Sequence, residues 1–335
     1  MANYPSRSDI VTAMRNPQVS FKSNELIGGS IIQKGSRVTQ YSGGYTTVFP
    51  FNTQNSNKVA VRLWIADIGD AKRRSSEISN YLKNLNNSYF AGFKYIDDAI
   101  LISGNLHAIV IMDWVDGQTV KEYINDNLSN TSKLLELANN FKDMVEYFHQ
   151  NEIAHGDLQH GNILIKSNGD LVAIDYDSMY IKPLDGMIDC IKGLEGYQHP
   201  TRQKNKFITP KLDYFSELVI YLSLIVYSEY PNMWNEYYGT EDLLFSKEDL
   251  ANPHNSSLIN TLCSSGNSVI SELTQKLKEQ LQLTDILQLS PLEELLINKL
   301  EVSKENIFDK WSKQPNPPTK KKVSIPTKKS ITDKF

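Results

Sequence analysis

The sequence predicts an α+β protein with two lobes, a small β-rich lobe followed by a larger and mainly helical one. Three observations favour this fold class. The chain has 335 residues, enough to bury a substantial core. Short runs of β-branched and aromatic residues, separated by turn-forming residues, fill residues 37–113. After residue 117, apolar side chains recur mainly at helical spacing.

Composition and charge are those of an ordinary soluble protein. Hydrophobic residues make up 40% of the chain and charged residues 22%, with a formal net charge of −4, as is typical of globular proteins. The longest apolar run, residues 218–227, is too short to cross a bilayer, and no signal segment opens the chain. We therefore expect a cytoplasmic location without membrane contact. Cys190 and Cys263 provide neither a disulfide framework nor a Cys-based metal site.

Lysines concentrate at the C-terminal end of the sequence. Residues 313–335 contain seven lysines and one aspartate, so the rest of the chain carries roughly −10. Proline and lysine at this density cannot form a core, which predicts a disordered tail. A solvated tail is the favoured interpretation, and a docking arm for an acidic partner or for nucleic acid is the alternative. The acidic remainder disfavours nucleic acid as the main ligand.

The domain organisation follows from these changes in composition along the chain. It comprises an N-terminal extension (1–35), a first lobe (36–113), a second lobe (114–312) and the tail (313–335). The first lobe is predicted to contain three strands, a helix and two further strands. The first three strands lie within residues 37–64, with turns at Gly43-Gly44 and 52–57. The helix follows over 70–84, and the last two strands lie near 93–95 and over 106–112.

The second lobe opens with an amphipathic helix that ends before Asn151. Its apolar positions follow helical spacing and are Leu134, Leu137, Ala138, Phe141, Met144, Val145 and Phe148. Later helices are predicted over residues 213–226, 269–281 and 292–300. A polar extension, a β-lobe, a hinge and an α-lobe make the simplest architecture.

A hairpin between these helices carries the chemistry. Asn168-Gly169 between two apolar runs predicts a two-residue hairpin loop. Counting outward from that loop places Asn162 opposite Asp175, about 5 Å away. Oxygen ligands at a hairpin mouth suit Mg²⁺, which is commonly held by one or two protein oxygens plus substrate phosphates. Asp157, just before the hairpin, has a carboxylate suited to accept a proton from an attacking hydroxyl. The magnesium ligands and this carboxylate together indicate phosphoryl transfer.

The alternative interpretation of Asp157, Asn162 and Asp175 is structural. Asn and Asp are common at strand ends, where they cap a hairpin or close an Asx turn. The surrounding motifs decide between the two interpretations.

Six motifs resemble those of protein kinases. His155-Gly-Asp-Leu-Gln-His-Gly-Asn162 resembles the catalytic loop H-R-D-L-x-x-x-N, and Asp175-Tyr-Asp177 stands in the place of D-F-G. Residues 59–62 resemble the V-A-I-K strand, and residues 112–117 resemble the adenine hinge. Residues 193–200 resemble the segment ending in A-P-E, and residues 213–218 resemble the start of the buried anchoring helix. The resemblance covers roughly residues 37–300 and is closest to bacterial kinase-like proteins.

The resemblance implies a bilobal protein kinase-like fold, ATP and Mg²⁺ as cofactors, and a protein substrate phosphorylated on serine or threonine. Asp157 would be the catalytic base, Asn162 and Asp175 the magnesium ligands, and Arg62 the strand cation at the phosphates. Nucleotide contacts are implied for Gly43, Gly44, Val48, Ala60, Arg62, Glu77, Met112, Asp113, Val115 and Leu164.

The sequence departs from the kinase pattern at several positions. Arg62 stands where kinases have lysine; it keeps the charge, but its planar fork differs from a lysine ammonium. Glu77 is either its ion-pair partner or a solvent-facing helix residue. Gln159 replaces a lysine, and Asp177 replaces the glycine of D-F-G. Gly156 replaces the arginine that reads activation-loop phosphate, so we expect no switching by phosphorylation of that loop.

Three function classes remain open on the sequence alone. An active protein kinase is favoured by intact Asp157, Asn162 and Asp175. A nucleotide-binding pseudokinase that acts as a scaffold is favoured by the departures from the kinase pattern and by the sparse glycines of the phosphate loop; these departures are Arg62, Gln159 and Asp177. A small-molecule kinase resembling aminoglycoside phosphotransferases shares the His-Gly-Asp element.

Overall fold

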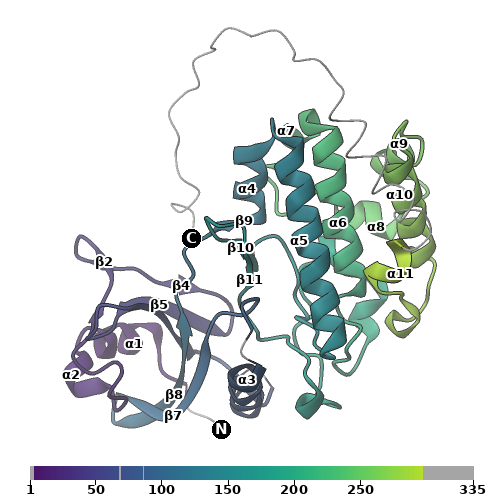
Figure 1. The fold of residues 1–335 in the computed structure, drawn as a ribbon. Helices are drawn as coiled ribbons and strands as arrows, with labels where there is room; N and C mark the ends of the chain where they lie inside the picture. Colours follow the sequence, from purple (N-terminus) through teal and green to yellow (C-terminus); the bar gives the residue numbers. More distant parts are fainter. Residues whose placement is uncertain (1–3, 68, 86, 297–335) are drawn as a thin grey trace, which may run out of the picture.

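The computed structural model describes residues 4–67, 69–85 and 87–296 (Figure 1). A β-rich lobe and a helical lobe follow one another along the chain, which confirms the predicted α+β class. The predicted tail over 313–335 and the last residues of the predicted second lobe lie outside the described residues. None of the described helices combines the length and hydropathy needed to span a membrane.

The N-lobe is built on a six-stranded antiparallel sheet. Its main path runs β1-β5-β6-β8-β7, and β4 pairs with β5. The strands are β1 (Ser30–Ile31), β4 (Tyr41–Ser42), β5 (Thr46–Asn52), β6 (Lys58–Trp64), β7 (Phe93–Ile102) and β8 (Asn105–Asp113). A separate ribbon joins β2 (Gln33–Lys34) to β3 (Arg37–Val38). Helix α3 (Ala71–Leu85) packs against β7 on the side facing the C-lobe (Figure 1).

The N-terminal segment belongs to this lobe and is not the polar extension expected from the sequence. Helices α1 (Arg7–Met14) and α2 (Pro17–Ser20) cover one face of the sheet. Ile10, Met14 and Leu26 are completely buried there, beside Phe49 and other inward-facing strand residues. These apolar residues are widely spaced in short elements, so they give no sustained helical periodicity in the sequence.

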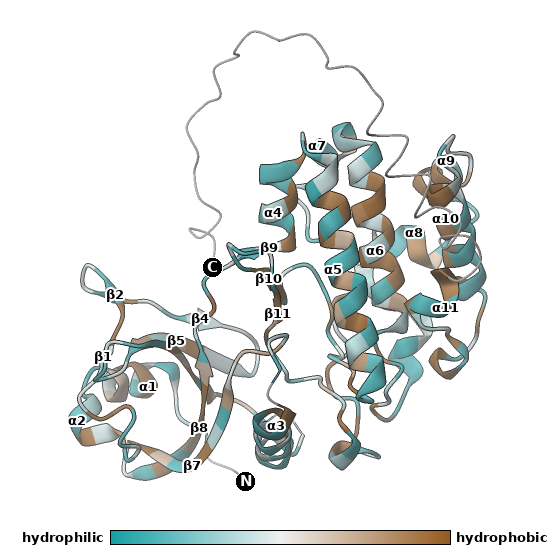
Figure 2. Cartoon of the chain, viewed as in Figure 1, coloured by the Kyte–Doolittle hydropathy of each residue, from teal (hydrophilic) through white to brown (hydrophobic). Residues whose placement is uncertain are grey.

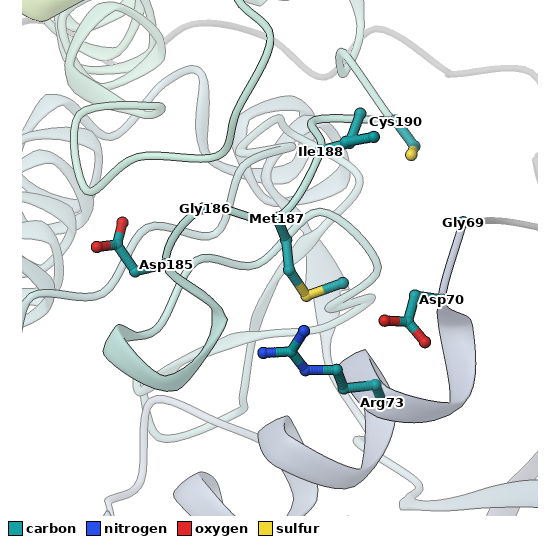
Figure 3. A pocket seen from close by; sticks show the side chains of 8 residues that line it. All are labelled: Gly69, Asp70, Arg73, Asp185, Gly186, Met187, Ile188 and Cys190. Atoms are coloured by element: carbon teal, nitrogen blue, oxygen red, sulfur yellow. The ribbon is translucent and has the colours of Figure 1, made fainter.

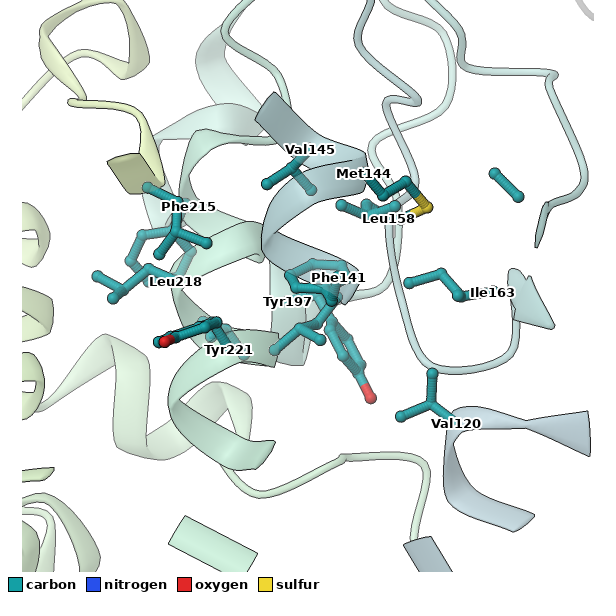
Figure 4. Close-up of a cluster of buried hydrophobic side chains, with 14 of the residues drawn as sticks. Val120, Phe141, Met144, Val145, Leu158, Ile163, Tyr197, Phe215, Leu218 and Tyr221 are labelled. Atoms are coloured by element: carbon teal, nitrogen blue, oxygen red, sulfur yellow. The ribbon is translucent and has the colours of Figure 1, made fainter. Parts of the chain in front are cut away.

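The C-lobe is organised around two long helices that lie side by side, α5 (Thr131–Gln150) and α6 (Tyr214–Glu229) (Figure 1). Hydrophobic residues recur along both (Figure 2), and α6 is buried over nearly its whole length. Their facing side chains, including Phe141 and Leu218, form the core shown in Figure 4. The remaining helices are α4 (Val120–Asn127), α7 (Trp234–Tyr237), α8 (Lys247–Ala251), α9 (Ser257–Cys263), α10 (Ser268–Leu281) and α11 (Leu292–Leu296).

A buried polar link joins three of these helices. The Nε2 nitrogen of His149 on α5 lies 2.7 Å from Glu217 on α6, and its Nδ1 nitrogen lies 2.9 Å from Glu293 on α11. Burial alone lowers the pKa of His149, but the hydrogen bonds and charges of these two carboxylates raise it to about 9. The imidazole is therefore a cation that ties the helices together at neutral pH.

The predicted hairpin is present, but its predicted register is wrong by one residue. β10 (Ile163–Ile165) pairs with β11 (Leu171–Ala173), and β9 (Gln118–Thr119) completes the small sheet. Ile163 pairs with Ala173. By this register, Asn162 lies opposite Ile174 and not opposite Asp175. The N–H of Ile174 donates to the carbonyl of Asn162 at 2.9 Å.

Side-chain hydrogen bonds in the loop explain the register. The amide of Asn168 donates to the Asp170 carboxylate at 2.7 Å, and the Asp170 N–H donates back to Asn168 Oδ1 at 3.2 Å. Only Gly169 is left-handed, with φ of 89°, whereas a two-residue type I′ loop needs both central residues at positive φ. The loop is a three-residue connection closed by the Lys166 N–H on the Asp170 carbonyl.

Candidate active site

The loop that carries Asp157 is fixed by hydrogen bonds to the C-lobe. The Asp213 carboxylate, just before α6, accepts the N–H groups of His155 and Gly156, the latter at 2.9 Å. The Nε2 nitrogen of His155 lies 2.8 Å from the carbonyl oxygen of Ile174 and ties the loop to the hairpin. His155 therefore positions the backbone of the loop, in agreement with its complete burial.

Glycine is required at position 156. Its φ is +79°, and a Cβ atom there would lie 2.2 Å from the carbonyl oxygen of Ser178. The loop and the segment after Asp175 thus pass too closely for any side chain. The arginine of the kinase pattern would not fit at this position without a shift of that backbone.

Asp157 lies at the centre of the site. Asn162 donates from Nδ2 to the Asp157 carboxylate at 3.2 Å and to its backbone carbonyl at 2.9 Å. The N–H of Leu194 donates to the other carboxylate oxygen at 3.1 Å. Burial raises the pKa of Asp157, His155 lowers it, and the charge of Asp175 raises it further, so that the pKa lies above its ordinary value. Asp157, Asn162 and Asp175 are thus brought together, although not by the predicted strand register.

Asp175 reaches the site through its backbone conformation. Its φ is +66°, which is rare for a residue other than glycine and is often found at functional sites. The turn directs the residue out of the β11 ladder towards Arg62, whose Nη1 lies 3.6 Å from Asp175 Oδ1. The Asp175 side chain is 54% exposed, which leaves it accessible to a ligand, whereas burial of the carboxyl group and the charge of Asp177 raise its pKa.

Arg62 is buried on β6 and is held by two carboxylates. Beside Asp175, it forms an ion pair through Nη2 with Asp177 Oδ2. Burial lowers the pKa of Arg62, and the charges of Asp177 and Asp175 more than compensate for this. The ion pair with Glu77 that was considered from the sequence does not form among the described residues; Glu77 is partly exposed on α3.

The strand residues expected at the nucleotide lie on one face of the sheet. Val48 is paired with Arg62 across β5 and β6, and Ala60 is paired with Met112 across β6 and β8. Because side chains alternate along a strand, these four share the face opposite to α1. Leu164 on β10 is half-buried in the small sheet.

The hinge keeps backbone groups available for a ligand. The Asp113 N–H donates to the Gly92 carbonyl at 3.0 Å, and its carboxylate accepts the Gly92 N–H at 3.2 Å. The Val115 backbone groups form no hydrogen bond within the described chain, so they can meet a purine edge.

The glycines between β4 and β5 are not required by the fold. Neither Gly43 nor Gly44 has a left-handed φ, and an added Cβ atom would contact nothing within 4 Å at either position. Arg7 of α1 donates to the Gly43 carbonyl at 3.1 Å and so contacts this turn. Open space above the turn leaves room for a ligand to approach the backbone.

The donor set fits a magnesium ion held jointly with a nucleotide. Asn162 uses its Nδ2 atom towards Asp157, which leaves Oδ1 for a cation, and Asp175 is accessible. In the described ranges, no group of three His, Cys, Asp or Glu side chains is arranged to hold a metal alone. Mg²⁺ commonly takes only one or two protein oxygens, with the remaining ligands from phosphates and water.

One contact at the site and one hollow elsewhere escape sequence analysis. The Leu194 N–H on Asp157 joins residues far apart in the sequence, and Gly193 beside it has a φ of +72°. A hollow of about 360 Å³ also lies between the start of α3 and the segment around Met187 (Figure 3). Arg73 and Cys190 line this hollow, and none of the predicted site residues does.

The chain matches the protein kinase domain family over residues 42–286, and it therefore belongs to that family. Among curated proteins, it is 25% identical over 208 residues to the inhibitor of nuclear factor kappa-B kinase subunit alpha of Danio rerio, covering 58% of this chain and 27% of that protein.

Two bacterial relatives match shorter parts of the chain. It is 33% identical over 69 residues to the probable serine/threonine-protein kinase PknB of Lactococcus lactis, covering 20% of the chain and 11% of that protein. It is 24% identical over 119 residues to the serine/threonine-protein kinase PrkC of Bacillus subtilis, covering 35% of the chain and 18% of that protein. The chain thus spans less than a third of the length of these relatives. The resemblance predicted from the motifs is confirmed.

Proposed function

We propose that the chain is an ATP- and Mg²⁺-dependent protein kinase that phosphorylates serine or threonine side chains of a protein. The observation that carries the proposal is that Asn162 donates to the Asp157 carboxylate while the charge of the exposed Asp175 acts on that same carboxylate. The serine/threonine kinases among the relatives support the choice of acceptor.

Each residue has a role that its position supports. Asp157, fixed by Asn162, accepts the proton of the acceptor hydroxyl as the hydroxyl oxygen attacks the terminal phosphorus of ATP; the bond from that phosphorus to the bridging oxygen breaks, and ADP leaves. Arg62 places a positive charge beside the phosphates. Asn162 and Asp175 would hold Mg²⁺, which neutralises phosphate charge when bound. The adenine ring of the nucleotide would lie beneath the Gly43-Gly44 turn. It would contact the backbone of Asp113 and Val115 and the side chains of Val48, Ala60, Met112 and Leu164.

Transfer of labelled phosphate tests this function. We expect the full chain with γ-labelled ATP and Mg²⁺ to label itself or a serine- and threonine-containing peptide library. Asp157→Asn is expected to abolish the label, because the base is lost while the shape of the side chain is kept. Asp143→Asn, which removes a carboxylate 60% exposed on α5, is the matched control and should retain it.

A nucleotide-binding pseudokinase is the second candidate. It is favoured by the Leu194 amide on Asp157 and by the two carboxylates that occupy Arg62. Magnesium-dependent ATP binding without any transfer from the native chain would select this candidate over the first.

A further inference from the structure

Arg62 requires a counter-ion because its guanidinium is buried. Its side chain is 2% exposed, and a buried charge without a partner is strongly destabilising. The helix acid at the expected position, Glu77, forms no ion pair with it among the described residues. The compensating charge must come from elsewhere.

Asp177 supplies the closer negative charge. Its Oδ2 atom forms the ion pair with Nη2 of Arg62, and its side chain is only 21% exposed. Asp175 lies farther away, at 3.6 Å, and is 54% exposed. Two carboxylates therefore share one guanidinium, and the less exposed of them holds it more closely.

Helix α3 is attached to the C-lobe in a way that does not involve Arg62. Its buried Arg74 donates to the carbonyl oxygens of Met179 and Ile188, at 3.3 and 3.2 Å. Arg74 thus links α3 to the C-lobe through backbone carbonyls. The charge of Arg62 is compensated separately, by the segment that also carries Asp175.

We propose that Asp177 is the positioning residue that holds Arg62 in the nucleotide site, in place of an acid on α3. In this arrangement Asp175 stays available to a divalent cation, because the guanidinium already has a closer partner. Without Asp177, Asp175 becomes the only carboxylate of the described residues that is paired with Arg62, and the guanidinium competes with the cation for it. This inference rests on the proposed function, since it assigns Asp175 to the cation.

The test compares Asp177→Asn, Asp177→Glu and Glu77→Gln in the full chain. Asp143→Asn again serves as the control for loss of one surface carboxylate. Calorimetry measures ATP binding over a series of Mg²⁺ concentrations, and thermal unfolding is recorded on each chain without ligand. The unfolding curves also show whether each variant is folded.

We expect Asp177→Asn to raise the Mg²⁺ concentration at half-maximal ATP binding by on the order of tenfold. Asp177→Glu should restore most of this loss, because it keeps the charge. Glu77→Gln should shift the concentration by less than about twofold, as expected of a partly exposed acid that forms no ion pair with Arg62 among the described residues. Equal losses in Asp177→Asn and Glu77→Gln, or no loss in Asp177→Asn, would overturn the proposal.

The two proposals can fail separately. If the native chain does not bind ATP, the proposed function is wrong, and the unfolding temperatures decide the role of Asp177. A drop in Asp177→Asn that Asp177→Glu reverses, and that Glu77→Gln does not produce, supports Asp177 as the partner of Arg62. The absence of that drop refutes it.

Discussion

Replacing Gly156 by alanine tests whether the close approach behind the catalytic loop sets the geometry of Asp157. Gly156 has a φ of +79°, and its added Cβ atom would lie 2.2 Å from Ser178 O. An L-residue in the left-handed region costs about 1–2 kcal/mol. The contact adds to this cost, because the atoms must separate by about 1 Å to reach an ordinary distance of roughly 3.4 Å.

The displacement acts directly on the adjacent Asp157, the proposed base. A misplacement of about 1 Å costs on the order of 100-fold in rate when groups must be aligned for reaction. We therefore expect Gly156→Ala to lower phosphoryl transfer by about that factor and to lower the free energy of unfolding by about 2–3 kcal/mol.

Gly169→Ala is the matched control for this experiment. Gly169 has a similar φ of +89°, but an added Cβ atom there meets nothing within 4 Å. It should show the cost of the left-handed conformation alone, about 1–2 kcal/mol, with transfer retained. Urea unfolding and labelled-phosphate transfer are measured on both variants. Equal effects of the two substitutions on transfer would refute the argument from close approach.

Three further predictions concern stability and regulation. The pKa of His149 is raised above its ordinary 6.5 to about 9, whereas burial raises that of Glu217 to about 7. Because the native state keeps the His149 proton after the unfolded state has lost it, the free energy of unfolding should fall by about 2–3 kcal/mol from pH 7 to 9.5; urea unfolding of His149→Gln should lack most of this fall. Ser178 and Tyr180 are buried, so mass spectrometry of active protein should find neither phosphorylated, and an activating phosphate there would contradict the expected absence of loop switching. Deleting residues 1–29 uncovers the apolar face of the sheet and should abolish the monomer peak in size-exclusion chromatography; a well-folded monomer would refute the assignment of this segment to the core.

The local motifs were predictable because each is encoded in a few consecutive residues. Asp157 and Asn162 lie five residues apart in a loop that the chain itself closes. The succession of strands, a helix and two further strands along the N-lobe was predictable from turns and alternation. The hairpin register was not predictable in this way. Hydrogen bonds between Asn168 and Asp170 stabilise a three-residue loop in place of the two-residue loop that Asn-Gly favours.

Long-range partners were beyond the sequence. Nothing local to Arg62 indicates that Asp177, and not Glu77, holds its guanidinium. The Leu194 amide on Asp157 likewise depends on how the segment before Tyr197 folds back. The buried N-terminal helices were missed for a related reason, since their apolar residues gain meaning only against the sheet that they cover.

The most direct measurement is ATP affinity with and without Mg²⁺, in the native chain and in Asp175→Asn. If Asp175 and Asn162 hold the cation that accompanies the nucleotide, Mg²⁺ should tighten ATP binding to the native chain, and Asp175→Asn should lose that gain while it still binds ATP weakly. A native chain indifferent to Mg²⁺, or a variant with an undiminished gain, would contradict a phosphoryl-transfer site at this hairpin.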